Sequence, residues 1–344
     1  MTAPVGTSNA SAAPAAPARP AASVETTLIQ TPKSFDRGDL VYVAYLLLPF
    51  RLFVQFGRVL GWIEMLVRPR ARRAVRANIE QAFGTTKSAR EKDALTRQVF
   101  EFHQMRVLLV LVAPLLAADG SLAKYFPLKD IEHLDRAVAA GKGVLIIGSH
   151  VNSVGGLLAM VRLRQLGYDV RVPMPDRNDA WPPTVFRRLV HRWTGAKSFS
   201  ELTGAFYAQF NVRPLMKVLE QGSILLLMAD GWHSASFVDA DFLGRRLPFT
   251  NAPMNFARLA GVSVVTFFSV GPPDHMHFAF EPAFTVERTT PPNLDVERKV
   301  RHFVSRVEER MLADIPCWQH WMVEDVFGSL ERWRDKPISE RYAV

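Results

Sequence analysis

One stretch of the chain, residues 141–160 (GKGVLIIGSHVNSVGGLLAM), constrains its fold more than any other. Four apolar residues in a row, 144–147, follow a Gly-Lys-Gly turn, and such a run is typical of a strand buried on both faces, as in a parallel sheet. Apolar residues then share one broad face from Val154 to about Gln165, which predicts a helix. His150 therefore lies in a strand-to-helix loop, where open α/β sheets usually bind their substrates.

Strands and helices alternate along the rest of the chain, which predicts an α/β fold with a mixed, largely parallel central sheet flanked by helices. Further strands are expected at residues 168–172, 223–228, 262–270 and 276–281, the last at an edge of the sheet. Helices are expected at residues 184–193, 213–221 and 252–260, followed by one that Asn293 caps and Pro316 ends. Residues 242–250 are expected to form a loop.

The chain divides into three parts by composition. Residues 1–37 are rich in Ala, Pro, Ser and Thr and cannot build a core, so we expect a disordered tail. Residues 38–76 are expected to form an apolar helical anchor at the membrane interface. Residues 77–335 would then form the α/β domain, beginning with a long helical region that breaks near residues 84–87.

The apolar part of residues 38–76 is interrupted too often for a clean membrane span, which needs about 20 predominantly apolar residues. Four residues break it: Pro49, Arg51, Arg58 and Glu64. Helices lying in the interface fit better, with three aromatic residues near the headgroups: Tyr42, Tyr45 and Trp62. Arginines that would attract anionic lipid follow at once: Arg68, Arg70, Arg72, Arg73 and Arg76. The alternative is a helical hairpin folded onto the domain, with its arginines in solvent.

Net charge, cysteine content and the absence of known motifs limit the partners and cofactors that the chain could bind. The net charge of +9 over 344 residues indicates an acidic partner, which could be nucleic acid, an anionic membrane or a phosphorylated substrate. The aromatic pattern gives nucleic acid no support, so we expect none as a partner. A single cysteine, Cys317, excludes an internal disulfide and a cysteine-based zinc cluster. Phosphate-loop, dinucleotide-binding and His-Glu-x-x-His patterns are absent from the sequence, and we expect neither cofactor nor metal.

Polar residues gather where the expected strands end. Asp230 and His233 follow the strand at residues 223–228 and should reach the same edge of the sheet as His150. Asn152 and Ser153 lie in the His150 loop and can hydrogen-bond to a substrate. Four arginines could bind a phosphate or carboxylate through their planar guanidinium groups, although any one of them could equally be a solvated charge: Arg177, Arg187, Arg188 and Arg245.

Six segments together carry a family resemblance. They are RANIEQAFG (residues 76–84), GKGVLIIGSH (141–150), LLLMADGWH (225–233), FLGRRLPFTNAP (242–253), FARLAGVSVV (256–265) and IPCWQHW (315–321). In order and spacing they resemble the bacterial lipid A biosynthesis acyltransferases, the lauroyl and myristoyl transferases of the lysophospholipid acyltransferase superfamily. The resemblance implies a glycerol-phosphate acyltransferase-like fold on the cytoplasmic face of the cell inner membrane. It also implies transfer of an acyl group from acyl carrier protein or a CoA thioester to a lipid hydroxyl.

The catalytic signature of that family is His-x-x-x-x-Asp/Glu, in which the histidine is the general base and the acid orients it. His150 matches the histidine, but Gly155 occupies the position of the acid, and no carboxylate occurs from His150 to Gly167. Asp230 could supply the acid, or Asn152 or Ser153 could hold the imidazole without charge. A third possibility is that the chain has left ordinary lipid acylation, either for an amine acceptor or for a catalytically silent role in binding lipid or acyl carrier protein.

Overall fold

The computed structural model describes residues 39–118, 120–174, 204–208, 212–231, 234–291 and 293–336. Its helices are α1 (Asp39–Leu47), α2 (Phe50–Val67), α3 (Pro69–Phe83), α4 (Ala89–Ala118), α5 (Ser121–Tyr125), α6 (Glu132–Ala139), α7 (Val154–Gln165), α10 (Val212–Glu220), α11 (Ala252–Ala260), α12 (Leu294–Ala313) and α13 (Val326–Asp335), with short 3-10 turns η1 (Gly84–Thr86), η2 (Ile315–Cys317) and η3 (Gln319–Met322). Its strands are β1 (Leu128–Lys129), β2 (Val144–Gly148), β3 (Val170–Met174), β4 (Ala205–Tyr207), β5 (Ile224–Met228), β6 (Phe237–Phe242), β7 (Arg245–Thr250), β8 (Ser263–Val270) and β9 (His277–Phe280).

A mixed sheet forms the centre of the molecule, as the sequence predicted. Within the described residues its strand order is β1-β9-β8-β2-β5-β3-β4, and only the β8–β9 pair is antiparallel. Every residue of β2 is buried, which confirms the interpretation of the apolar run at residues 144–147. The expected edge position of β9 is wrong, because the two-residue strand β1 pairs with its outer side.

Residues 242–250 are not a loop. They contribute the end of β6, a tight turn and β7, which form an antiparallel hairpin separate from the main sheet. Leu243 and Gly244 make the turn, and both have positive φ, as a two-residue hairpin turn requires. Asn293 lies at the start of α12 as predicted, but its side chain makes no cap: its Oδ1 accepts a hydrogen bond from Arg258.

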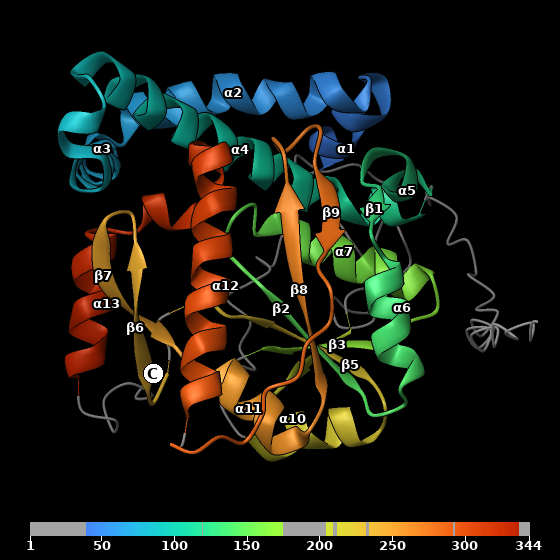
Figure 1. The fold of residues 1–344 in the computed structure, drawn as a ribbon. Helices are drawn as coiled ribbons and strands as arrows, with labels where there is room; N and C mark the ends of the chain where they lie inside the picture. The colour runs from blue at the N-terminus through green and yellow to red at the C-terminus, as the bar shows by residue number, and fades with distance from the viewer. Residues whose placement is uncertain are drawn as a thin grey trace, which may run out of the picture.

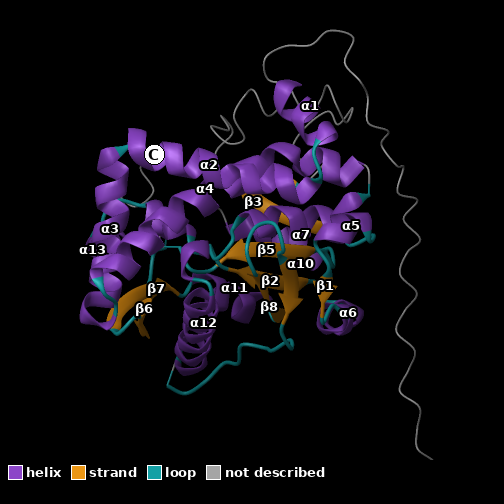
Figure 2. Ribbon diagram, turned by 90° about the horizontal axis from the view of Figure 1, so that it is seen from above, coloured by secondary structure: helices purple, strands orange, loops and turns teal. Residues whose placement is uncertain are grey.

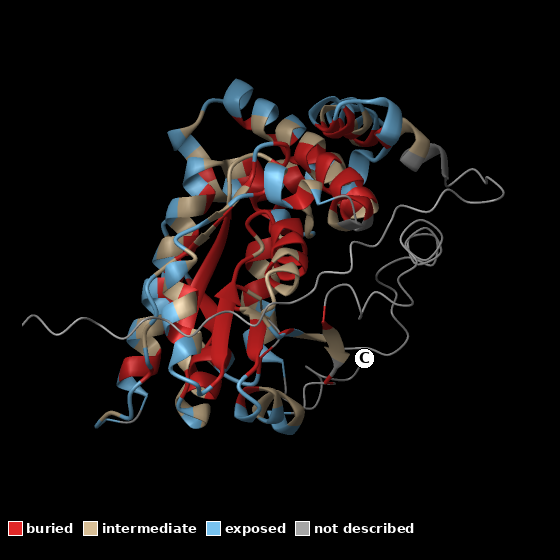
Figure 3. Ribbon diagram, turned by 90° about the vertical axis from the view of Figure 1, so that its right-hand side faces the viewer, coloured by how far each residue is buried: buried red, intermediate tan, exposed pale blue. Residues whose placement is uncertain are grey.

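Helices cover both faces of the sheet (Figure 1). The ring of Phe268 on β8 stacks on Phe303 of α12 with centroids 6.4 Å apart. The next residue of β8, Ser269, faces α7, since a Cβ placed on Gly155 of that helix would touch it. Because successive strand residues point to opposite faces, α12 and α7 cover opposite sides. The main core lies between these layers, and the outer faces of the helices remain exposed (Figure 3).

The helices α2 and α4 lie side by side across one end of the sheet, the end toward which β8 points (Figures 1 and 2). Gly57 and Gly61, one helical turn apart on α2, allow this approach, since a Cβ on Gly57 would lie 2.6 Å from the main chain of Met105. Glu64 interrupts the apolar sequence yet is buried, because Gln104 of α4 donates a hydrogen bond to it at 2.8 Å. The helical region after residue 76 breaks at Gly84–Thr86, as predicted.

The opposite face of α2 is apolar and exposed. Its exposed apolar side chains are Leu52, Phe56, Val59, Trp62, Ile63, Leu66 and Val67. Two arginines of α2, Arg51 and Arg58, are exposed as well. Tyr45, which we expected near the headgroups, is instead buried against the ring of Phe53. Among the described residues, no helix has both the length and the apolar character to cross a bilayer.

Candidate active site

The register of two parallel strands brings His150 and Asp230 together. Gly148 at the end of β2 is paired with Met228 at the end of β5, and each of the two residues follows its strand by the same two positions. The carboxyl ends of parallel strands meet at one edge of the sheet, so both side chains enter the same loop cluster. This edge is the one crossed by α2 and α4.

The carboxylate of Asp230 holds His150 at two points. Its Oδ1 lies 2.7 Å from Nδ1 of the imidazole, and its Oδ2 accepts the main-chain N–H of His150 at 2.7 Å. The contact that the sequence predicted between these residues is therefore present. Asp230 is buried, whereas the His150 side chain keeps 27% of its surface exposed. We refer to the pair below as the His150–Asp230 dyad.

Burial and charge oppose each other within the dyad. Burial raises the pKa of Asp230, but the charge and hydrogen bond of His150 and the charge of His320 outweigh it and lower the pKa to about 2. Burial lowers the pKa of His150, but the charge and hydrogen bond of Asp230 raise it above its ordinary value. With Asp230 ionised, Nδ1 must donate the hydrogen bond, and neutral His150 then carries its lone pair on Nε2.

The position of the family acid is closed by packing. A Cβ on Gly155 would lie 2.5 Å from Cβ of Ser269 and 2.7 Å from Sδ of Met276, and it would also collide with the Ser269 hydroxyl. Gly155 is buried in the first turn of α7. No side chain fits there without movement of the β8–β9 segment. The carboxylate of this site comes instead from Asp230, in the loop that follows β5.

Asn152 and Ser153 do not hold the imidazole. The Asn152 side-chain amide donates to the Gly271 carbonyl at 2.6 Å, and the Ser153 hydroxyl contacts the Gln319 side chain. Asn152 adopts a positive φ of 51°, an uncommon conformation for a residue with a side chain. Both residues shape the loop around His150. Neither one holds the imidazole in place of Asp230.

His320 joins the dyad, and sequence reasoning missed it. Its ring lies 4.3 Å from the His150 ring, and its Nε2 is 3.8 Å from Oδ2 of Asp230. Burial, together with the charge of His150, lowers the pKa of His320 to about 3. The family-like segment at residues 315–321 was the one available signal, but it gave no reason to single out this histidine.

Two imidazoles and a carboxylate are ligands that zinc accepts. The ligand atoms of His150, Asp230 and His320 lie within 4.8 Å of one another, so this cluster could hold a metal ion. A metal there would have to displace the direct hydrogen bonds that already satisfy the Asp230 carboxylate. The geometry fits proton transfer without further ligands.

The single cysteine is not placed to act as a nucleophile. Cys317 is buried and its Sγ lies 2.8 Å from Oδ2 of Asp314. Burial and the charge of Asp314 raise the pKa of the thiol well above its ordinary value, which disfavours the reactive thiolate.

Arg245, expected to bind substrate, packs against α13 instead. Its guanidinium lies 5.0 Å from the centroid of the Phe327 ring and 3.6 Å from the Glu331 carboxylate. The remaining expected binding residues lie outside the described residues, as does the helix expected at residues 184–193: Arg177, Arg187, Arg188 and His233.

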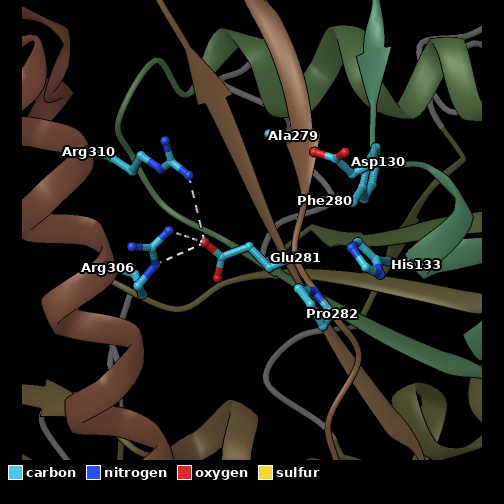
Figure 4. Close-up of a pocket in the computed structure, with 8 residues that line it drawn as sticks. All are labelled: Asp130, His133, Ala279, Phe280, Glu281, Pro282, Arg306 and Arg310. Carbon is cyan, nitrogen blue, oxygen red and sulfur yellow. Dashed lines mark hydrogen bonds and ion pairs between the residues drawn. The ribbon is translucent and has the colours of Figure 1, made fainter.

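A separate cavity of about 500 Å³ lies away from the dyad, between α12 and the start of α6 (Figure 4). Arg306 and Arg310 point from α12 toward Glu281, and Asp130 and His133 line the other side. Arg306 donates two hydrogen bonds, at 2.9 and 2.7 Å, to Oε1 of Glu281. The cavity contains none of the residues that the sequence singled out.

Comparison with known proteins identifies a family for most of the chain. Residues 38–324 match the family model described as bacterial lipid A biosynthesis acyltransferase. No curated protein matches the chain.

Proposed function

Because the chain belongs to the bacterial lipid A biosynthesis acyltransferase family, we propose that it transfers an acyl group from a thioester donor to a lipid acceptor with the His150–Asp230 dyad as its catalytic base. The match covers most of the chain and supports acyl transfer as the general activity. The observation that carries the specific proposal is the hydrogen bond between His150 Nδ1 and Asp230 Oδ1, because it replaces the acid missing at Gly155.

The proposed reaction follows from the tautomer of His150. Nε2 takes the proton of the acceptor hydroxyl as its oxygen attacks the thioester carbonyl, and the ionised Asp230 stabilises the resulting imidazolium. When the tetrahedral intermediate collapses, the C–S bond breaks and the imidazolium returns its proton to the thiolate. An ester and a free thiol leave, and the dyad is restored without a covalent acyl-enzyme.

A hydroxyl acceptor is preferred over an amine or a silent binding role. The loss of the motif acid was the feature that favoured those alternatives. A buried, ionised carboxylate on Nδ1 removes that reason, since it supplies the orientation and charge that a base for a hydroxyl needs. The donor is a thioester of acyl carrier protein or CoA, both of which are acidic partners suited to a chain of net charge +9.

We place the protein on the cytoplasmic face of the inner membrane, bound at the interface through α2 and α3. The exposed apolar face of α2 would enter the acyl boundary, and the exposed Arg70, Arg72 and Arg73 of α3 would lie against anionic headgroups. The end of the sheet that α2 and α4 cover also carries the dyad, so a lipid acceptor would have a short path to His150.

The test is mass spectrometry of lipids and small metabolites from cells that express the wild-type chain, His150→Ala or His302→Ala. His302 is an exposed histidine on α12 and serves as the matched control. We expect an acylated product with the wild-type chain and the control but not with His150→Ala. Equal product from His150→Ala and from the wild-type chain would move the chemistry away from this site, and an added acyl amide would identify an amine acceptor.

A further inference from the structure

The segment at residues 317–320, from the family-like stretch near the end of the domain, runs alongside the catalytic loop. The main-chain N–H of Asn152 donates to the Cys317 carbonyl at 2.8 Å, and the N–H of Gln319 donates to the His150 carbonyl at 3.0 Å. Between these bonds, Val151 and Trp318 form an antiparallel bridge. We call residues 317–320 the clamp segment, because this short ladder fixes the main chain of the loop on both sides of Val151.

The clamp segment also contacts the dyad through His320. The His320 ring packs at 41° to the His150 ring and is hydrogen-bonded to the backbone of Asp230. The low pKa of His320 keeps it uncharged while His150 takes up and releases a proton. His320 therefore borders both members of the dyad without repelling the imidazolium.

A buried arginine fastens the clamp segment to α4. Nη1 of Arg106 donates to the Cys317 carbonyl at 3.0 Å, the same carbonyl that accepts the N–H of Asn152. Burial lowers the pKa of Arg106, and taking a guanidinium out of water costs several kcal/mol unless its surroundings compensate. An apolar residue would fill the space at lower cost, so packing alone does not account for this side chain.

We infer that the clamp segment positions the catalytic base, with His320 as the positioning residue against the dyad and Arg106 as the anchor of the segment on α4. This inference rests on the proposed function, because it assigns what holds the dyad and not what the dyad does. A base must be held to within a fraction of an ångström, and a displacement of about 1 Å can reduce the rate about 100-fold.

The test compares His320→Ala and His320→Phe with the His302→Ala control in the full-length protein, using the same acyl donor. His320→Ala removes the ring from the face of His150, and we expect kcat to fall on the order of 10- to 100-fold with little change in KM. His320→Phe keeps a ring of similar size but loses the hydrogen bond to Asp230, and its kcat should lie between those of the alanine variant and the wild type. Arg106→Lys should lower kcat in the same way.

A spectroscopic readout separates positioning from general stability. The Nδ1 proton of His150, held against the Asp230 carboxylate, should give a downfield proton resonance in the wild type and in His320→Phe. In His320→Ala we expect this resonance to broaden, since water gains access to the pair. Wild-type kcat together with an unchanged resonance in the two His320 variants would overturn the inference, as would a raised KM with unchanged kcat. Either outcome is distinct from failure of the proposed function, which is judged by His150→Ala.

Discussion

At the scale of single residues, Asp230 determines the pH at which His150 loses its proton and becomes able to act as a base. The raised pKa of His150 means that the base is protonated, and inactive, at a higher pH than a free imidazole would be. Activity should therefore fall as the pH drops through this raised pKa, well before Asp230, with a pKa of about 2, takes up a proton.

The variant Asp230→Asn tests this assignment. It removes the negative charge of Asp230, the larger cause that raises the pKa of His150, and leaves burial, which lowers it. The acid limb of the kcat/KM profile should consequently move to lower pH, while kcat at its plateau falls on the order of 10²- to 10⁴-fold. Activity measured across the pH range checks both effects. An unshifted acid limb with a normal plateau would show that another group controls the base.

Gly155 gives a second prediction at this scale. Gly155→Ala should lower the free energy of unfolding by about 1–3 kcal/mol, since the new Cβ would overlap Ser269 and Met276. Gly156→Ala is the control, because nothing lies within 4 Å of a Cβ at Gly156 and alanine favours a helix. Thermal unfolding of the two variants should place Gly155→Ala below the wild type and Gly156→Ala at or above it.

The same contact predicts the fate of a restored family motif. Gly155→Glu should fail to rescue Asp230→Asn, since the carboxylate cannot be accommodated without displacing Ser269. Recovered turnover in the double variant would mean that the β8–β9 segment moves aside readily.

The sequence predicts those parts of the site whose contacts leave a pattern in it. The His150–Asp230 pair was predictable, because each residue follows an apolar run typical of a buried parallel strand, and the carboxyl ends of parallel strands meet at one edge of a sheet. His320 was not predictable, because the clamp segment meets the loop through main-chain hydrogen bonds that impose no periodicity. The sequence also could not show that Ser269 and Met276 leave no room for a side chain at Gly155, because a glycine in a helix does not indicate which distant residues pack against it.

At the scale of elements, the packing of α2 on α4 depends on two glycines, Gly57 and Gly61. Gly61→Val should separate the two helices, because a Cβ there would lie 2.5 Å from Cα of Glu101 and would also strike the Phe100 carbonyl. We expect a loss of about 1–3 kcal/mol or more, because the opposing atoms are main chain and cannot rotate away. Val59→Ala, on the exposed face of the same helix, should change the melting temperature little. Equal melting temperatures for the two variants would contradict this packing.

Some helices and strands could be predicted from the sequence, and others could not. The helices α7 and α11 have the predicted bounds, since their apolar spacing is regular. The β6–β7 hairpin is not evident from the sequence, because its turn is Leu-Gly and lacks the Asn-Gly or Asp-Gly pair that usually marks such turns. The strand β1 is too short, at two residues, to leave any alternation in the sequence.

At the scale of the whole molecule, the exposed face of α2 should determine membrane binding. Phe56→Glu or Trp62→Glu should each weaken binding to vesicles of phosphatidylethanolamine and phosphatidylglycerol by about tenfold, because an apolar group that would enter the acyl boundary becomes charged. Leu259→Glu is the matched control, as an exposed leucine on α11 at the opposite end of the molecule (Figure 1). Flotation of full-length protein with vesicles measures the difference. If all three variants float equally, the exposed face of α2 does not determine membrane binding.

The separation of the two dyad residues along the chain has a consequence for assembly. His150 and Asp230 are 80 positions apart, whereas the usual five-residue spacing would place both groups in one strand-helix unit. A nascent chain that has released β2 and α7 but not β5 holds a histidine with no carboxylate beside it. The base is therefore completed only when β5 enters the sheet next to β2, and activity during refolding should not appear before that strand pairing has formed.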